Sequence, residues 1–226
     1  YKVTDYIPLI DLESKPEVSE FINAITTNLT SFYREEHHFE FLAKTICPEL
    51  AISNATSKKI RIWSAGCSTG EEAYSIALTL RENLSLSGWD CKILATDLDS
   101  KVIEKAQNGI YGVERIELLS LERKKQWFQY DKKDKDIVRV KPALQELISF
   151  KRLNLLEKWP MKGEFDLIVC RNVVIYFNEA TQAELFDRFA DLLKEGGYLI
   201  IGHSESLNRV CQRFKLIGKT IYQKII

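Results

Sequence analysis

The apolar residues of this 226-residue chain form short strand-like runs that alternate with segments of helical spacing. From about Lys58 to Ala106 the pattern predicts a strand, a helix, a strand and a helix, in that order. Their ranges are Ile60 to Ser64, Glu71 to Leu84, Cys91 to Thr96 and Lys101 to Ala106. This alternation is typical of the beginning of a parallel α/β sheet.

The second half of the chain continues the alternation. Phe165 to Cys170 is a continuous apolar run, as expected of a central parallel strand, and Glu179 to Leu193 has amphipathic helical spacing. We expect Gly196 and Gly197 to end that helix, because glycine commonly follows a helix C-terminus. The remaining predicted strands are Tyr198 to Gly202, Phe214 to Lys219 and Thr220 to Lys224, with Gly218 between the last two. We therefore predict an α/β protein with an open, mostly parallel sheet.

Two segments depart from this pattern. Residues 1 to about 52 lack strand alternation and contain a predicted helix that opens near Ser14 and Pro16. Residues 108 to 152 read as an inserted small β-subdomain, with 11 Lys and Arg against 6 Asp and Glu from Arg115 to Arg152. That excess indicates either a solvated surface or a face for an acidic protein partner. The predicted elements of the insertion are a helix around Ser120 to Gln129 and strands at Ile137 to Lys141 and Leu147 to Arg152.

The composition narrows the class of protein. Lys and Arg together number 32, as do Asp and Glu, so no net charge favours nucleic acid or a membrane surface. The five cysteines are widely spaced and include no C-x-x-C pair, which favours reduced thiols in the cytoplasm, and three histidines make a His-rich metal site unexpected. No apolar run reaches the roughly 18 residues of a membrane helix. We expect a soluble, cytoplasmic monomer without a metal.

The loop between the first predicted strand and helix has the features of a cofactor loop. Gly66 and Gly70 let a ligand approach the backbone, and the helix that follows directs free N–H groups into the turn. Glu71 and Glu72 open that helix and would repel a phosphate, whereas they suit a hydroxyl, ammonium or sulfonium group. S-adenosylmethionine is therefore a better match than a dinucleotide, whose binding motif would also require glycine at positions 68 and 71.

The same loop imitates a hydrolase motif. Residues 66 to 70 fit G-x-S-x-G, and Ser68, Asp166 and His203 follow the order of an α/β-hydrolase triad. However, this serine follows the first strand of the sheet rather than a later one, and no His-Gly-Gly segment precedes it. We therefore regard the hydrolase interpretation as the weaker one.

Two further segments place polar side chains where a ligand of such a loop would lie. Asp97 ends the second predicted strand, where an acid can accept the hydroxyl groups of a ribose; otherwise Asp97 or Asp99 only caps the next helix. Asn28, Thr30 and Arg34 lie among aromatic residues and can converge on one ligand if the segment turns; otherwise they cap a helix end and face solvent.

Five segments together resemble the CheR-type chemoreceptor methyltransferases, in order and spacing, from about Thr26 to the C-terminus. They are Thr26 to Glu35 (TTNLTSFYRE), Ser64 to Ser75 (SAGCSTGEEAYS), Ala95 to Asp99 (ATDLD), Arg152 to Leu156 (RLNLL) and Cys170 to Phe177 (CRNVVIYF). The resemblance implies a Rossmann-like methyltransferase fold, with a mostly parallel sheet, an antiparallel C-terminal strand and an inserted small antiparallel β-subdomain. It also implies transfer of a methyl group from S-adenosylmethionine to glutamate side chains of chemoreceptors, leaving S-adenosylhomocysteine.

The resemblance also implies roles for individual residues. Arg34 and Tyr176 would orient the reactants, with Tyr176 facing the substrate. The implied cofactor contacts are Asn28, Thr30 and Arg34, Glu71 at the methionine end, Asp97 at the ribose, Asn154 and Leu155 flanking the adenine, and Arg171 and Asn172 in the same pocket.

The resemblance implies a division of the chain as well. Residues 1–52 would be part of an N-terminal helical domain with a cofactor-contacting segment, and residues 53–226 the methyltransferase domain. The family's receptor-tethering members have a glycine-rich loop in the inserted subdomain, whereas Tyr130 to Asp136 contains no glycine. We therefore expect the receptor's helical domain to be recognised without a tether. Two other functions stay open: sensing of S-adenosylmethionine without transfer, and methylation of a small molecule or RNA.

Overall fold

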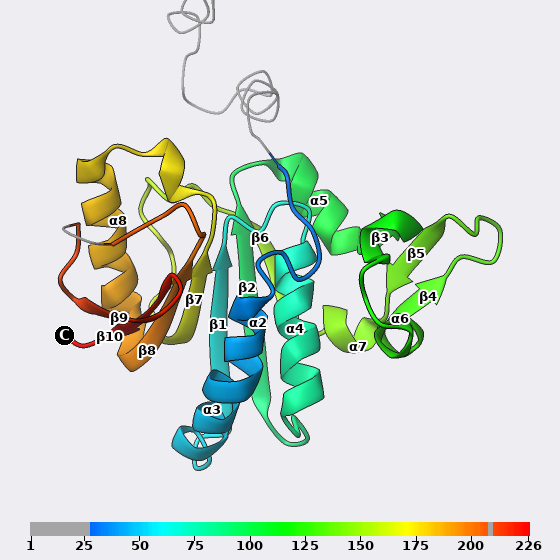
Figure 1. Cartoon of the computed structure of the whole chain (residues 1–226), viewed down its shortest axis with the longest axis horizontal. Helices are drawn as coiled ribbons and strands as arrows, with labels where there is room; N and C mark the ends of the chain where they lie inside the picture. The colour runs from blue at the N-terminus through cyan, green and yellow to red at the C-terminus, as the bar shows by residue number, and fades with distance from the viewer. Residues whose placement is uncertain (1–27, 208–209) are drawn as a thin grey trace, which may run out of the picture.

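The computed structural model describes residues 28–207 and 210–226, and its main feature is a seven-stranded sheet of order β6-β2-β1-β7-β8-β10-β9 (Figure 1). The first five strands of that order pair in parallel, and β10 pairs antiparallel with β8 and β9. The predicted α/β class with an antiparallel C-terminal strand is thus confirmed. The strands are β1 Lys59–Ala65, β2 Asp90–Asp97, β6 Ile148–Arg152, β7 Phe165–Cys170, β8 Leu193–Ile201, β9 Phe214–Gly218 and β10 Ile221–Lys224.

Helices cover both faces of this sheet, because alternate residues of the central strands point to opposite sides. Ile60 and Ile62 of β1 pack in one cluster with residues of α4, while Trp63 packs in a second cluster with Phe186 and Phe189 of α8. The side chains of all five of these named residues are fully buried. The helices are α2 His37–Phe41, the π-helix η3 Leu42–Ile46, α3 Cys47–Ser53, α4 Glu71–Asn83, α5 Ser100–Asn108 and α8 Glu179–Leu192.

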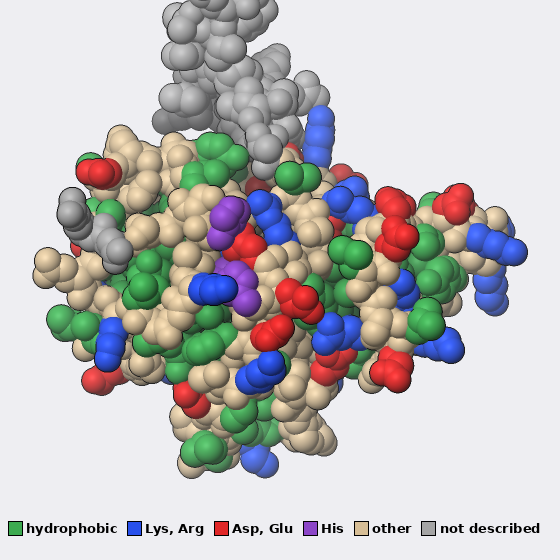
Figure 2. All heavy atoms as spheres, viewed as in Figure 1, with side chains coloured by type: hydrophobic (Ala, Val, Ile, Leu, Met, Phe, Trp, Pro, Cys, Tyr) green, Lys and Arg blue, Asp and Glu red, His purple; other side chains and the backbone are tan. Residues whose placement is uncertain are grey.

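A three-stranded antiparallel sheet of order β3-β5-β4 projects from one side of the main sheet (Figure 1). On the face shown in Figure 2, acidic and basic side chains are interspersed over this projection, so the basic excess forms no uniform patch there. Its elements are β3 Ile110–Gly112, η4 Val113–Ile116, α6 Leu121–Trp127, β4 Phe128–Tyr130, β5 Ile137–Val140 and α7 Pro142–Gln145.

Three predictions about elements were wrong. Strand β6, which we placed in the insertion, pairs with β2 in the main sheet, so the small sheet is narrower than residues 108–152. Phe128 and Gln129, predicted as helical, belong to β4, where Phe128 is buried against the small sheet's core. Gly196 and Gly197 do not end α8: the helix stops at Leu192, Leu193 is already extended, and both glycines lie within β8.

Two sequence predictions are not decided by this architecture. The helix opening near Ser14 and Pro16 lies outside the described residues, and the division of the chain at residue 52 stays a prediction. Within residues 28–207 and 210–226, no helix has the length and apolar character needed to cross a membrane.

Candidate functional site

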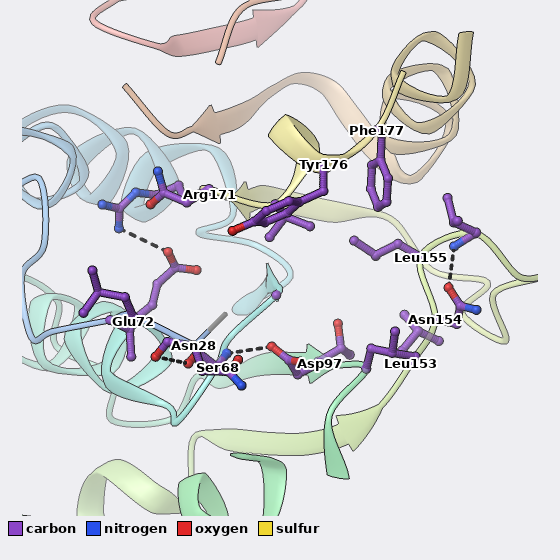
Figure 3. Close-up of a pocket in the computed structure, with 18 of the residues that line it drawn as sticks. Asn28, Ser68, Glu72, Asp97, Leu153, Asn154, Leu155, Arg171, Tyr176 and Phe177 are labelled. Atoms are coloured by element: carbon purple, nitrogen blue, oxygen red, sulfur yellow. Dashed lines mark hydrogen bonds and ion pairs between the residues drawn. The ribbon is translucent and has the colours of Figure 1, made fainter. Parts of the chain in front are cut away.

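A pocket of about 450 Å³ lies at the carboxyl ends of β1, β2 and β7 (Figure 3). All predicted site residues except Glu71 line it, although they come from four separate segments of the chain. Its volume is within the usual range for a small-molecule site. The lining residues that we predicted are Asn28, Thr30, Arg34, Asp97, Asn154, Leu155, Arg171, Asn172 and Tyr176, and those that we did not predict include Ser68, Glu72, Leu153 and Phe177.

The loop from Gly66 to Gly70 forms one wall of the pocket. The backbone N–H groups of Gly66 and Cys67 donate to the carbonyl of Thr96 at 2.8 and 2.9 Å, which ties the loop to the end of β2. Gly66 has a φ of 91°, and a Cβ atom there would lie 2.3 Å from Cγ2 of Val173. The loop therefore needs glycine at this position both for its backbone and for its contact with the segment after β7.

Asp97 faces the pocket from the end of β2 and does not cap the next helix. Its two carboxylate oxygens accept the N–H groups of Ser68 at 2.8 Å and Asp99 at 3.1 Å, and a carboxylate can accept more hydrogen bonds than these. Asp99 is the N-cap residue of α5 instead, accepting from the N–H of Lys101 at 2.8 Å. Burial raises the pKa of Asp97 despite its backbone N–H donors, so its carboxylate gains from a hydroxyl or cationic partner.

The two glutamates at the start of α4 point to different places. Glu71 is fully buried outside the pocket, where it pairs with Arg115 at 2.6 Å and accepts from the Thr69 hydroxyl at 2.6 Å. Glu72 lines the pocket instead (Figure 3). It also accepts from the Ser64 hydroxyl at 2.7 Å. The structure thus places Glu72, which we did not predict as a site residue, in the pocket wall, and it places Glu71, which we did predict, outside the pocket.

Arg171, the first residue after β7, is buried and holds several groups together. Its Nη1 donates to Glu72 at 3.1 Å, and its Nη2 donates to the carbonyl of Arg34 and lies 3.5 Å from Glu35. Burial raises the pKa of Glu72, while the charge of Arg171 and the two hydrogen bonds oppose that rise. Because burial still disfavours the ionised form of Glu72, a second cation beside this carboxylate would stabilise that form.

The segment that begins at Asn28 closes over the loop. The Asn28 carbonyl accepts from the Ser68 hydroxyl at 3.2 Å, and the Asn28 amide donates to Asp99 at 3.0 Å. Arg34 reaches back to donate to the Leu29 carbonyl at 2.6 Å, so it stabilises the turn while its side chain lines the pocket. These contacts bring Asn28, Thr30 and Arg34 together with the loop, as the turn considered from the sequence required.

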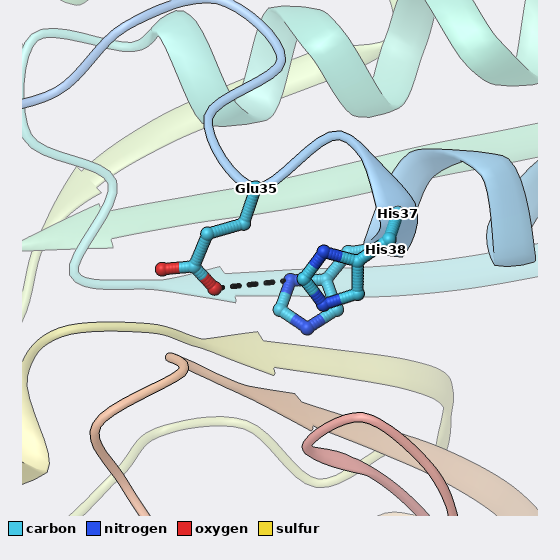
Figure 4. Close-up of side chains that lie close together, drawn as sticks. All are labelled: Glu35, His37 and His38. Carbon is cyan, nitrogen blue, oxygen red and sulfur yellow. Dashed lines mark ion pairs between the residues drawn. The ribbon is translucent and has the colours of Figure 1, made fainter.

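Glu35, His37 and His38 lie close together next to this segment (Figure 4). One oxygen and two nitrogens of these side chains lie within 4.8 Å of one another, a spacing at which a metal ion can be held. However, Oε2 of Glu35, which lies 3.5 Å from Nδ1 of His38, is also 3.5 Å from Nη2 of Arg171, and a metal ion beside a guanidinium would be repelled.

The environment of Glu35 and His38 favours another interpretation. His203 and Arg171 lower the pKa of Glu35 although its partial burial would raise it, and burial lowers the pKa of His38 to about 4, with Arg171 acting in the same direction. With His38 neutral and Glu35 ionised, Arg171 provides a permanent positive charge beside the Glu35 carboxylate. We interpret the cluster as a support that holds Arg171 in place.

The opposite end of the pocket is apolar. Leu153, Leu155 and Phe177 line it, and Figure 3 shows Asp97 between this end and Glu72. The Asn154 side chain makes its hydrogen bonds within its own turn: it accepts from the N–H of Leu156 at 3.0 Å and donates to Glu157 at 3.0 Å. The pocket thus has an acidic end, an acid in its middle and an apolar end, which matches an elongated ligand with a cationic and a flat apolar part.

Tyr176 lies at the mouth of the pocket in η5 (Val174–Tyr176). Its side chain is 64% exposed, and Figure 3 shows its hydroxyl turned toward the ligand space. An exposed hydroxyl at the rim can reach both a ligand in the pocket and a second reactant that approaches from solvent.

The hydrolase interpretation fails on geometry. The Ser68 hydroxyl donates to the Asn28 carbonyl, Asp166 binds Asn54, Lys194 and the N–H of Arg61, and His203 binds Glu35. Asp166 lies near the amino end of β7, whereas the pocket is at the carboxyl ends of the strands. The three residues form no triad.

Comparisons with known proteins show which proteins this chain is similar to. A family model described as CheR methyltransferase, SAM binding domain, matches residues 28–223. The probable chemotaxis protein methyltransferase of Rhizobium etli is 44% identical over 207 residues, covering 90% of this chain and 77% of that protein. The chemotaxis protein methyltransferase of Salmonella typhimurium is 40% identical over 220 residues, covering 96% and 74%. A solved magnesium protoporphyrin IX methyltransferase from Synechocystis, with bound SAH, is more distant, with a TM-score of 0.40, 14% identity and coverage of 83% and 71%.

Proposed function

The chain belongs to the CheR methyltransferase family, and we propose that it methylates glutamate side chains of chemoreceptors with S-adenosylmethionine. The products are a glutamyl methyl ester and S-adenosylhomocysteine. The observation that supports this most is the pocket itself, in which Glu72, Asp97 and an apolar end follow one another in the order that this cofactor requires.

The donor set of the pocket fits this cofactor. We assign Glu72 to the ammonium group, since its raised pKa reflects a buried carboxylate that benefits from a cation. Asp97 is assigned to the ribose hydroxyls through its remaining lone pairs, and Leu153, Leu155 and Phe177 to the faces of the adenine. Asn28, Thr30, Arg34, Asn154, Arg171 and Asn172 complete the walls. Glu71 is assigned to the pair with Arg115 and not to the cofactor.

The reaction needs little acid–base assistance from the protein. When bound, the cofactor supplies an electrophilic methyl group on a positive sulfonium. A glutamate carboxylate is already ionised at neutral pH, so one of its oxygens can attack that carbon while the carbon–sulfur bond breaks. The protein's task is to align the two reactants and to exclude water while opposite charges neutralise each other. We assign the alignment to Arg34 and Tyr176.

Replacing Tyr176 with phenylalanine is expected to lower kcat about tenfold and to leave the affinity for S-adenosylhomocysteine within about twofold. The hydroxyl at the rim would orient the incoming carboxylate, whereas the cofactor is held deeper in the pocket. Tyr198→Phe is the matched control, because it removes a hydroxyl that binds Glu49 far from the pocket. Steady-state kinetics and calorimetric binding measure both quantities. An unchanged kcat in Tyr176→Phe would remove the hydroxyl from the reaction.

The proposed activity can be tested by incubating the protein with receptor-containing membranes and S-adenosylmethionine labelled in the methyl group. We expect label in the receptor fraction that mild base releases as methanol, since carboxyl methyl esters are base-labile. Cofactor binding without label transfer would instead indicate a sensing module. Base-stable label, or label in RNA or small molecules, would indicate a methyltransferase of another substrate class.

We propose that the substrate is the helical cytoplasmic domain of the receptor, and that the protein binds it without a C-terminal tether. We also propose that the protein acts as a monomer in the cytoplasm. The turn from Asp131 to Asp136 supports the absence of a tether. The Asp131 carboxylate accepts the N–H groups of Lys133 at 2.7 Å and Asp134 at 3.1 Å, and Asp134 accepts that of Asp136 at 3.0 Å. These backbone donors are therefore already used within the turn.

Peptides that copy receptor C-termini are accordingly expected to bind no more tightly than scrambled peptides of the same composition. Fluorescence anisotropy with labelled peptides measures this directly. Tight, sequence-dependent binding would show that the small sheet takes a tether in spite of its glycine-free turn.

A further inference from the structure

A buried carboxylate outside the pocket, that of Glu205, binds the backbone of the segment from Asn172 to Tyr176. Three residues of this segment line the pocket: Asn172, Val173 and Tyr176. Glu205, in the loop after β8, is 5% exposed. Its Oε1 accepts the N–H groups of Val173 at 2.9 Å and Val174 at 3.0 Å, and its Oε2 accepts those of Asn172 at 3.1 Å and Gly202 at 2.6 Å. One side chain thus satisfies three consecutive N–H groups between Arg171 and Tyr176.

The backbone that Glu205 holds has an unusual conformation. Asn172 has a φ of 58°, in the left-handed region that few residues other than glycine adopt readily. This turn leads from β7 into η5, and so it sets the direction in which Tyr176 leaves the sheet. Charge-assisted hydrogen bonds from backbone N–H groups are among the strongest that a neutral donor can make, so they can hold such a turn.

The segment also fits closely against its neighbours. A Cβ atom on Gly202 would lie 2.6 Å from the side-chain nitrogen of Asn172, 2.9 Å from its backbone nitrogen and 3.0 Å from the Glu205 carboxylate. On the other side, Val173 packs directly on Gly66 of the cofactor loop. The segment is therefore fixed between the Glu205 loop and the cofactor loop, and a shift at Glu205 must move Tyr176 relative to the ligand space.

We propose that Glu205 is a positioning residue for methyl transfer, acting through the backbone of Asn172 to Val174 on the placement of Tyr176. Arg171 is held separately by Glu72 and Glu35. Glu205 therefore affects the position of Tyr176 at the rim of the pocket more than the position of the residues at its acidic end. This inference rests on the proposed function for its effect on turnover. Its structural part, the placement of the segment, does not.

The Glu205→Gln variant tests this. A glutamine amide would place an NH₂ group against backbone N–H donors, so at least one oxygen's hydrogen bonds would be lost. We expect kcat per folded molecule to fall about 10- to 100-fold, because a displacement on the order of 1 Å at a reacting group has effects of this size. The affinity for S-adenosylhomocysteine should stay within about threefold of the wild type. The folded fraction is counted from the stoichiometry of that binding.

A double-mutant cycle separates positioning from a general loss of stability. If Glu205 acts through Tyr176, the Glu205→Gln and Tyr176→Phe variant should have nearly the kcat of Glu205→Gln alone. The control Asp166→Asn alters a carboxylate that is equally buried and also accepts a backbone N–H, but near the amino end of β7. It should lose stability without losing kcat per folded molecule. Additive effects in the cycle, or an equal loss of kcat in Asp166→Asn, would overturn the proposal.

Hydrogen exchange distinguishes failure of this inference from failure of the proposed function. The amides of Asn172 to Val174 should exchange faster in Glu205→Gln than in the wild type, whatever reaction the protein performs. Unchanged exchange would contradict the inference alone. Wild-type protein without methyl transfer would contradict the proposed function, while the placement of the segment by Glu205 would still stand.

Discussion

The Glu72→Gln variant is expected to bind S-adenosylhomocysteine about 10- to 100-fold more weakly than the wild type. Hydrogen bonds to a charged group are worth about 1.5–3 kcal/mol, and the substitution removes the charge that we assign to the ligand's ammonium group. Glutamine keeps the size of the side chain and can still accept from the Ser64 hydroxyl. Isothermal titration calorimetry measures the change in affinity.

The neighbouring residue supplies the matched control. Glu71→Gln removes an equal charge one position earlier in the same helix, but Glu71 faces Arg115 outside the pocket. Its affinity for S-adenosylhomocysteine should stay within about threefold of the wild type. If Glu71→Gln weakens binding strongly and Glu72→Gln does not, the assignment from the structure is wrong and the one from the sequence is right.

The Arg171→Met variant should lose about 3–5 kcal/mol of unfolding free energy, the range for removing one partner of a buried ion pair. Methionine fills much of the same space, but Glu72 and Glu35 would lose their shared cation and the Arg34 carbonyl its donor. For a chain of this size the melting temperature should fall by roughly 10 °C. Cofactor affinity should fall as well, because the acidic end of the pocket loses its shape.

The pH dependence of this loss has a definite sign. Burial already raises the pKa of Glu72 in the folded protein, and removing Arg171 raises it further. Because a raised folded-state pKa favours the protonated form, the variant should recover part of its stability as the pH falls and Glu72 takes up a proton. Urea unfolding at neutral and at mildly acidic pH measures this.

A surface pair provides the control for charge alone. Arg61 pairs with Asp90 at an exposed position, where water screens the two charges, so Arg61→Met should cost far less stability than Arg171→Met. Equal losses in Arg61→Met and Arg171→Met would contradict the view that Arg171 organises a buried network.

Much of the fold was predictable because its signals are local. The apolar run from Phe165 to Cys170 is buried on both faces, so its composition alone indicated a central strand. The glycines of the loop at Gly66 and Gly70 both have positive φ, as a turn of this kind requires. The partners of β6 and the glycines within β8 were not predictable from local pattern, because pairing between distant segments decided them.

The choice between Glu71 and Glu72 illustrates what a sequence pattern leaves open. Adjacent residues of a helix point about 100° apart, and nothing in the local sequence says which one faces the ligand. The answer depends on Arg115 and Arg171, which come from segments far along the chain. The positions of Leu153 and Phe177 in the pocket, and the contacts of Glu205 with the segment after β7, were missed for the same reason, since each depends on a contact between distant segments.

The most direct measurement of the central claim is peptide mass spectrometry of a chemoreceptor after incubation with the protein and S-adenosylmethionine. Our account predicts a gain of one methyl group on glutamate side chains of the receptor's cytoplasmic helices, which is lost after mild base. At limiting cofactor, this methylation should be about 10- to 100-fold slower with Glu72→Gln than with the wild type. Methylation of any other side chain, or an unmodified receptor in the presence of bound cofactor, would contradict it.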